Sequence, residues 1–375
     1  MAGIYLHIPF CKQACHYCDF HFSTSLKYKD DMLRALLKEI SLQKGYLGGE
    51  FIETIYFGGG TPSVLTGAEI NILIDAITKV HTVSADAEIT LEANPDDLDS
   101  NKLAALKASP VNRFSIGIQS FYDEDLLWMN RVHRASEAEA CVKRAQDAGF
   151  ENITVDLIYG YPLLTDIKWK HNLNKVFDLD VPHISAYSMT VEPQTALASF
   201  ISKKKQQPMS DQQSAAQFML MTDVMQTNGF EQYEISNFCK PGHYSQHNSN
   251  YWRGVKYIGM GPSAHSYNGD TRQWNIANNS KYMQSVLAEG IVPAEVELLT
   301  ESNRLNEYIM TSLRTKWGLD LDKLETIAAG SAVLLIKAAT TFFNDGSISQ
   351  AERVITLTPN GKLYADHIAS ELFFQ

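Results

Sequence analysis

Short hydrophobic runs alternate with longer amphipathic segments along the first half of the chain. The runs predict six β-strands, at 4–8, 54–57, 89–92, 113–118, 153–157 and 183–187. Helices are expected between them, near 30–43, 67–82, 100–108, 135–148 and 168–178. Successive strand-then-helix units form a parallel sheet with right-handed crossovers, and six of them suit a partial barrel better than a closed eight-stranded one. The pattern therefore predicts an α/β fold built as a partial (β/α)6 TIM-like barrel.

The second half of the chain changes character. A polar segment around 200–212 is expected to be a surface loop, followed by a helix at 214–228 and a stretch rich in Gly, Asn and His from 237 to 270. From about 295 the pattern predicts two helices, a hairpin around Asp345-Gly346 with a strand at 354–357, and a last helix begun by Thr358-Pro359. We therefore expect a barrel over 1–235, a connecting region over 236–295 and a smaller C-terminal helical or winged-helix-like domain over 296–375.

Charge and composition narrow the function classes. The formal net charge of -11 and the pI near 5.5 argue against nucleic acid as a partner, because phosphate binding draws on an excess of Lys and Arg. The run Lys203-Lys204-Lys205 is interpreted as a solvated loop. The sequence has neither a signal-peptide pattern nor the roughly 18 to 20 consecutive apolar residues that cross a bilayer, so we expect a cytoplasmic protein.

Three of the five cysteines lie close together, as Cys11-x3-Cys15-x2-Cys18, directly after the first predicted strand. In a reducing compartment such a cluster indicates metal binding rather than disulfides. Thiolates are the usual ligands of iron–sulfur clusters, whereas structural zinc would need a fourth ligand such as His16 or His21. The spacing favours an iron–sulfur cluster and leaves zinc as the alternative. Cys141 and Cys239 stand alone and are expected to be small buried residues.

Further candidate residues follow the other strands. In isolation each has an ordinary explanation as a turn glycine, a helix cap or a surface charge. They all fall at the carboxyl ends of consecutive parallel strands or in the loops after them, where barrels of this class bind ligands. The candidates are the run Gly58-Gly59-Gly60-Thr61-Pro62, then Glu92, Gln119, Arg131 and Asp156. Together they predict one ligand-binding face.

The cysteine triplet in the context His7-Ile8-Pro9-Phe10-Cys11, with Phe20 two positions after Cys18, resembles the signature of the radical S-adenosylmethionine (SAM) superfamily. The resemblance extends over nearly the whole chain, to the group of oxygen-independent coproporphyrinogen III oxidases and HemW-type haem chaperones. It implies a [4Fe-4S] cluster on the three cysteines, with SAM chelating the fourth iron. Tyr5, Gly59 and Glu92 match positions that contact this SAM. Positions of a second SAM site in the oxidase are matched by Gly60, Thr61, Gln119, Arg131 and Asp156.

Two features separate the chaperone from the oxidase. The oxidase has a further Cys two residues after the third cysteine and a longer N-terminal extension, whereas Phe20 stands at that position here and ten residues precede Cys11. The segment from His247 to Trp252, HNSNYW, resembles the HNxxYW motif of HemW-type proteins. This resemblance implies that the protein binds haem and that His247 is an axial ligand of the haem iron. His243 and His265 are the other candidates for this ligand.

The expected function is that of a haem chaperone that delivers haem to acceptor haemoproteins. The resemblance also implies respiratory acceptors at the membrane and formation of a homodimer with the cluster bound. The alternative is an oxidase that decarboxylates a porphyrinogen by radical chemistry. A tRNA-modifying radical SAM enzyme is a third reading, which the acidic charge disfavours.

Overall fold

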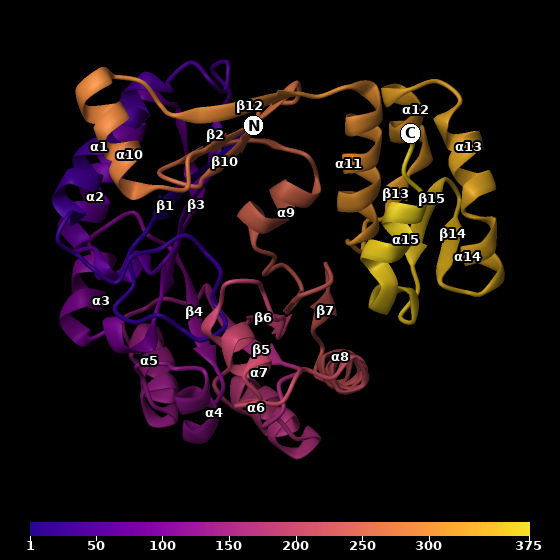
Figure 1. The fold of residues 1–375 in the computed structure, drawn as a ribbon, viewed down its shortest axis with the longest axis horizontal. Coiled ribbons are helices and arrows are strands. Elements are labelled where there is room, and N and C mark those ends of the chain that lie inside the picture. The colour runs from indigo at the N-terminus through magenta and orange to yellow at the C-terminus, as the bar shows by residue number, and fades with distance from the viewer.

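Six parallel strands alternate with helices in the computed structural model, which describes residues 1–375 (Figure 1). The strands are β1 (Ala2–Ile8), β2 (Ile52–Gly59), β3 (Val83–Ala93), β4 (Arg113–Gln119), β5 (Ile153–Tyr159) and β6 (His183–Ser188). The helices between them are α1 (Lys29–Leu42), α2 (Gly67–Val80), α3 (Ser100–Lys107), the short α4 (Asp123–Trp128), α5 (Ala135–Asp147) and α6 (Asp166–Asp178). Each strand pairs in parallel with the next along the chain, which confirms the predicted partial barrel.

The strands place apolar side chains under the helices and polar side chains in the barrel interior. In β1, Ile4, Leu6 and Ile8 are buried in the hydrophobic core. The alternate residues Tyr5 and His7 point the other way, because successive side chains of a strand face opposite sides of the sheet. Most barrels of this class fill the interior with branched aliphatic residues. A polar interior instead offers hydrogen-bonding groups to a ligand or to another segment of the chain.

The sheet continues beyond the barrel on both sides. On one side β9 (Lys256–Met260) pairs in parallel with β1, and β10 (His265–Tyr267), β11 (Thr271–Asn275) and β12 (Ala294–Leu298) follow in antiparallel order. On the other side β8 (Asn237–Cys239) pairs with β6 and with β7 (Glu231–Gln232). The whole sheet has 12 strands. Its outer strands have only two to five residues each, which is too short for the sequence pattern to reveal.

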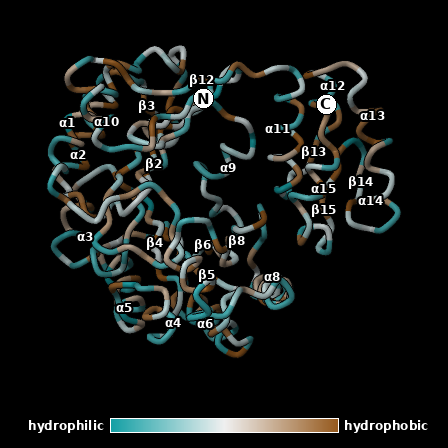
Figure 2. The backbone as a smooth tube through the Cα atoms, in the orientation of Figure 1, coloured by the Kyte–Doolittle hydropathy of each residue, from teal (hydrophilic) through white to brown (hydrophobic).

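The remaining helices of this part cover the barrel or enter it. Here α7 (Ala196–Ser202) ends at the start of the expected loop, and α8 (Asp211–Thr227) follows it, while Lys203, Lys204 and Lys205 are exposed as predicted. The helix α10 (Asn279–Gln284) and the π-helical turn η3 (Ser285–Glu289) pack against α1. The short helix α9 (Gln246–Trp252) lies between the barrel strands and the C-terminal part in Figure 1. It is drawn as a hydrophilic segment in Figure 2, although it contacts β2 inside the barrel.

The C-terminal part has a separate hydrophobic core of 16 residues. It contains α11 (Glu301–Leu313), β13 (Leu319–Asp320), α12 (Leu321–Ile327), α13 (Ser331–Ala338), α14 (Thr340–Asn344), β14 (Ile348–Ala351), β15 (Val354–Leu357), the 3-10 turn η4 (Gly361–Tyr364) and α15 (Ala365–Glu371). The three strands form an antiparallel sheet in the order β13-β15-β14. The hairpin turns at 352–353, not at Asp345-Gly346, because these two residues end α14. No helix in the structure is both long and apolar enough to cross a membrane.

Candidate cofactor-binding site

The loop that carries the three cysteines lies between β1 and α1 and is held mainly by its backbone. The Cys11 N–H donates to the carbonyl of Ser23 at 3.0 Å, and the His16 N–H donates to the carbonyl of Met129 at 3.1 Å. The Lys12 ammonium group pairs with both Asp96 and Asp97 in the loop after β3. The three thiols form no disulfide, so the loop leaves them available as ligands.

The glycine run after β2 supports this loop. The Gly60 N–H donates to the carbonyl of Ile8 at 2.9 Å, and the Thr61 N–H donates to the carbonyl of Phe10 at 2.7 Å. A Cβ atom on Gly60 would lie 2.6 Å from the Phe10 carbonyl oxygen, so any side chain there would push the loop away. The absence of a side chain at Gly60 is therefore needed for the cysteine loop to lie against β2, whether or not a ligand is bound.

Each of two thiols accepts a hydrogen bond from a neighbouring side chain. The Thr61 hydroxyl donates to Cys11 Sγ at 3.4 Å, and the Arg131 guanidinium donates to Cys15 Sγ at 3.4 Å. Burial raises the pKa of Cys11 and raises the pKa of Cys18 to about 12. Since metals bind the thiolate form, loading this loop must displace protons from the thiols. Three free thiols on one loop fit a four-iron cluster, which takes Cys ligands and can leave one iron open.

Each histidine offered as a zinc ligand has one ring nitrogen in a hydrogen bond. His16 Nδ1 is hydrogen-bonded to the carbonyl of Trp128 at 2.8 Å, and its ring packs edge-on against Phe200. His21 Nε2 is hydrogen-bonded to Asn279 Oδ1 at 2.7 Å. No set of three or more His, Cys, Asp or Glu side chains lies close enough to hold a single metal ion. Because the other nitrogen of each ring has no hydrogen bond, these contacts by themselves do not decide between zinc and an iron–sulfur cluster.

Glu92 lies at the carboxyl end of β3 beside the glycine run. Its carboxylate accepts a hydrogen bond from the Tyr56 hydroxyl at 2.8 Å. Burial raises the pKa of Glu92 to about 8, and the nearby charge of Asp156 adds to this rise. Tyr5 stacks on Tyr56 with ring centroids 6.1 Å apart. Glu92 is therefore a buried acceptor that a ligand with a positive charge would stabilise in its ionised form.

The candidates from β4 and β5 lie in the same region. The Arg131 guanidinium donates to Asn94 Oδ1 at 2.7 Å and to the carbonyl of Gly117 at 2.6 Å. Burial raises the pKa of Asp156 to about 6, which hydrogen bonds from Ser115 and the charge of Arg131 partly offset. Gln119 has φ of 69°, a conformation that side chains seldom adopt. Such a residue at the end of a barrel strand is typical of functional sites.

His247, the predicted haem ligand, is buried in the barrel interior. Its ring is hydrogen-bonded through Nδ1 to the Thr54 hydroxyl and through Nε2 to the Tyr251 hydroxyl, both at 2.8 Å. Burial lowers the pKa of His247 to about 3, so the ring is neutral. Both ring nitrogens are occupied, and iron could bind only after one of these hydrogen bonds breaks. The substitutes His243 and His265 are exposed.

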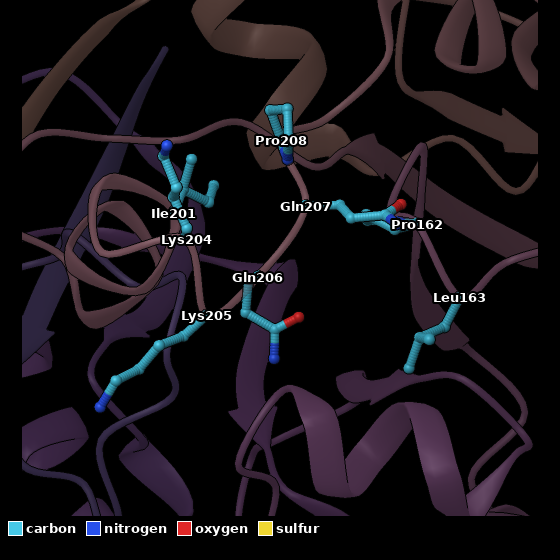
Figure 3. Close-up of a pocket in the computed structure, with 8 residues that line it drawn as sticks. All are labelled: Pro162, Leu163, Ile201, Lys204, Lys205, Gln206, Gln207 and Pro208. Atoms are coloured by element: carbon cyan, nitrogen blue, oxygen red, sulfur yellow. The ribbon is translucent and has the colours of Figure 1, made fainter.

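A cavity of about 700 Å³ lies beside the segment that follows β5. Pro162 and Leu163 line one side, and residues 201 and 204–208 line the other (Figure 3). The Lys205 side chain extends away from Leu163 in Figure 3. The cavity therefore does not bring the lysines together around one point, and none of the predicted ligand residues lines it.

Several residues that build the site were missed by the sequence reasoning. Asn94 joins Arg131 to Thr61, since its amide nitrogen donates to the Thr61 hydroxyl at 3.3 Å. The Asn130 side chain donates to the carbonyl of Ala14 at 2.7 Å and so holds the cysteine loop. The sequence offered a hint of both roles. Asn94 follows the predicted ligand residue Glu92 by two positions, and Asn130 directly precedes Arg131.

A partial barrel with three free cysteines in the loop after its first strand defines a radical SAM protein, and residues 5–176 match the Radical SAM superfamily. The haem chaperone HemW of Bacillus subtilis is 34% identical to the chain over 98% of both proteins. The HemW of Escherichia coli is 37% identical over 70% of this chain and 69% of that protein. The structure of coproporphyrinogen III oxidase (HemN) from Escherichia coli, a radical SAM enzyme, superposes with a TM-score of 0.85 at 25% identity and covers 99% of this chain and 90% of that chain. The chain belongs to the HemW family.

Proposed function

We propose that the protein is a cytoplasmic haem chaperone that binds a [4Fe-4S] cluster, SAM and haem, and delivers haem to acceptor haemoproteins. The observation that carries the proposal is similarity over nearly the full length to proteins named as haem chaperones. The five cysteines are free, as suits a reducing compartment. Respiratory haemoproteins at the membrane are the proposed acceptors.

In this proposal Cys11, Cys15 and Cys18 hold three irons of the cluster. When bound, the cluster supplies an open iron that SAM can chelate. Glu92 accepts hydrogen bonds from SAM, and Tyr5 and Gly59 line the same site. Gly60, Thr61, Gln119, Arg131 and Asp156 form a second site, which a second SAM or part of the haem occupies.

His247 is the proposed haem ligand, reached by opening α9. A neutral imidazole is a standard axial ligand of haem iron. Tyr251 lies one turn away on the same helix and moves with His247, whereas Thr54 belongs to β2. Opening of α9 would therefore break the hydrogen bond to Thr54 and expose the His247 ring to haem iron.

The test offers haem and coproporphyrinogen III separately to anaerobically reconstituted protein. We expect a Soret band with haem, and no protoporphyrinogen even with reductant and SAM. His247→Ala should shift the Soret band and weaken haem retention, whereas His367→Ala, at an exposed histidine of α15, should leave both unchanged. An unaltered haem spectrum in His247→Ala would move the ligand to His243 or His265. Variants of the three cluster cysteines should still bind haem, because the cluster and haem are bound by different residues.

The oxidase is the second candidate, favoured by the close structural match to HemN. Sustained decarboxylation of coproporphyrinogen III with consumption of SAM would establish it. A homodimer that forms with the cluster bound is a separate part of the proposal. Size-exclusion chromatography of the protein with and without the cluster measures its oligomeric state.

A further inference from the structure

The helix α9 is held in the barrel by a buried carboxylate. Glu88 of β3 accepts hydrogen bonds from the backbone N–H groups of Gln246 and His247, both at 3.0 Å. The His247 ring also lies close to β1, since a Cβ atom on Gly3 would be 3.4 Å from it. Thr54 of β2 and Glu88 of β3 thus hold the first turn of α9, and the His247 ring packs beside Gly3 of β1.

Tyr56 contacts both this helix and the proposed SAM site. Its hydroxyl donates to Glu92 Oε1 at 2.8 Å, and its ring stacks on the His247 ring with centroids 4.9 Å apart and planes inclined by 21°. The two contacts use different parts of one rigid side chain. A restraint on Glu92 therefore restrains the Tyr56 ring, and the Tyr56 ring restrains His247.

The other end of α9 contacts the C-terminal part. The Arg314 guanidinium lies over the Trp252 ring, 5.2 Å from its centroid, and the Lys323 ammonium group donates to the carbonyl of Arg253 at 3.4 Å. A movement of α9 out of the barrel would therefore also change the contacts of the C-terminal part.

We propose that Tyr56 is a positioning residue that couples SAM binding at Glu92 to the release of α9 and His247 from the barrel interior. The coupling itself rests on geometry, and its use in haem binding rests on the proposed function. Bound SAM fixes Glu92, which fixes the Tyr56 hydroxyl and keeps the ring stacked on His247. Haem ligation needs His247 to leave this position, so SAM and haem oppose each other. By linkage, each ligand weakens the other by the same factor.

The first experiment needs no haem. Amide hydrogen exchange of α9 is measured by mass spectrometry on cluster-loaded protein, anaerobically, with and without SAM. In the natural protein SAM should slow the exchange of α9 about 5-fold or more, because opening of the helix becomes less favourable. Tyr56→Phe keeps the stacked ring but loses the hydroxyl, so SAM should change its exchange less than 2-fold. Tyr159→Phe, whose ring stacks on Trp169 on the helix side of the sheet, is the matched control and should behave as the natural protein.

A second variant separates coupling from general loosening of α9. Thr54→Val removes the hydrogen bond to His247 Nδ1 without touching Glu92. In this variant the amide hydrogens of α9 should exchange faster both with and without SAM. The ratio of the exchange rate without SAM to the rate with SAM should stay as in the natural protein. If Thr54→Val abolishes the SAM effect as fully as Tyr56→Phe does, the assignment to Tyr56 is overturned.

The second experiment measures haem affinity by absorbance titration at zero and saturating SAM. The natural protein should bind haem about 5- to 10-fold more weakly with SAM, and Tyr56→Phe should show less than a 2-fold difference while still binding SAM. An equal SAM effect in both proteins, or none in the natural protein, would overturn the coupling to haem. Failure to bind haem under any condition would overturn the proposed function instead, and the exchange experiment would then decide the coupling alone.

Discussion

The two ends of the barrel are built from different kinds of contact. At the carboxyl ends of the strands, backbone hydrogen bonds hold the cysteine loop together with the side chains of Lys12 and Asn130, and the thiols of the loop form no disulfide. At the amino ends, the Thr54 and Glu88 side chains of β2 and β3 hold α9, and both ring nitrogens of His247 have partners. The first end keeps its reactive groups available, whereas the second end uses its polar groups to fill the barrel. The comparison teaches that one barrel can hold an accessible site and a closed one, with Tyr56 between them.

The largest expected effect is loss of the cluster from the cysteine loop, at the carboxyl ends of the barrel strands. Replacing Cys11, Cys15 or Cys18 by Ala should remove most of the iron and sulfide from anaerobically purified protein, because two thiolates hold a four-iron cluster poorly. Metal and sulfide analysis measures the result. Cys141→Ala and Cys239→Ala, both at buried thiols, are the controls. The ligand assignment is wrong if Cys239→Ala loses as much iron as Cys15→Ala does.

A large loss of folding stability is expected when the contact of Glu88 with α9, at the amino ends of the barrel strands, is removed. Glu88→Ala would leave two backbone N–H groups of α9 without their acceptor and the buried Arg113 guanidinium without the opposite charge 3.8 Å away. Breaking a buried ionic contact of this kind costs about 3 kcal/mol. Urea unfolding followed by circular dichroism measures the loss, with the exposed Glu151→Ala as control. A change below about 0.5 kcal/mol would show that α9 does not depend on Glu88.

The glycine run allows a sharper test of the first end. Gly60→Ala places a Cβ atom 2.6 Å from the Phe10 carbonyl oxygen, so the cysteine loop must shift and stability should fall by about 2 kcal/mol. Gly45→Ala is the matched control, because nothing lies within 4 Å of the added atom. Thermal unfolding and iron content are measured on both variants. Equal behaviour of the two would exclude a close approach at Gly60.

Glu92 tests ligand binding at the first end without breaking it. Glu92→Ala should retain the cluster and bind SAM more weakly, because a lost hydrogen bond to a ligand costs roughly 1–3 kcal/mol, or about 5- to 150-fold in affinity. Isothermal titration of cluster-loaded protein with SAM measures the change. Identical titration curves for this variant and the natural protein would remove Glu92 from the site.

A pH dependence of stability is also expected. The pKa of Glu92 rises from its ordinary value of 4.5 to about 8 in the folded protein, so the folded state binds a proton that the unfolded state has released. Between these two values Glu92 therefore lowers stability as pH rises. Metal-free natural protein should lose more unfolding free energy from pH 5 to 8 than Glu92→Gln does. Parallel pH profiles for the two proteins would contradict the raised pKa.

The sequence predicted the barrel and the residues of its first end, because both depend on local patterns. The strand and helix periods are local, and Cys11, Cys15 and Cys18 lie within eight residues. The position of α9 could not be predicted, because Thr54 and Glu88 contact His247 from 193 and 159 residues away. The C-terminal hairpin was misplaced for a local reason: Asp-Gly is typical of hairpins and also of helix ends, and Gly346 with φ of 76° follows α14.

The parallel pairing of β9 with β1 has a consequence for the biosynthesis of the protein. The first strand to leave the ribosome has one neighbour in β2, but its other neighbour starts at Lys256. Until about 260 residues have been translated, β1 is an unprotected edge with the unpaired N–H and C=O groups that promote aggregation. A nascent chain stalled before Lys256 would present this edge to chaperones and to other nascent chains. The outer edge of the first strand is therefore covered only late in synthesis.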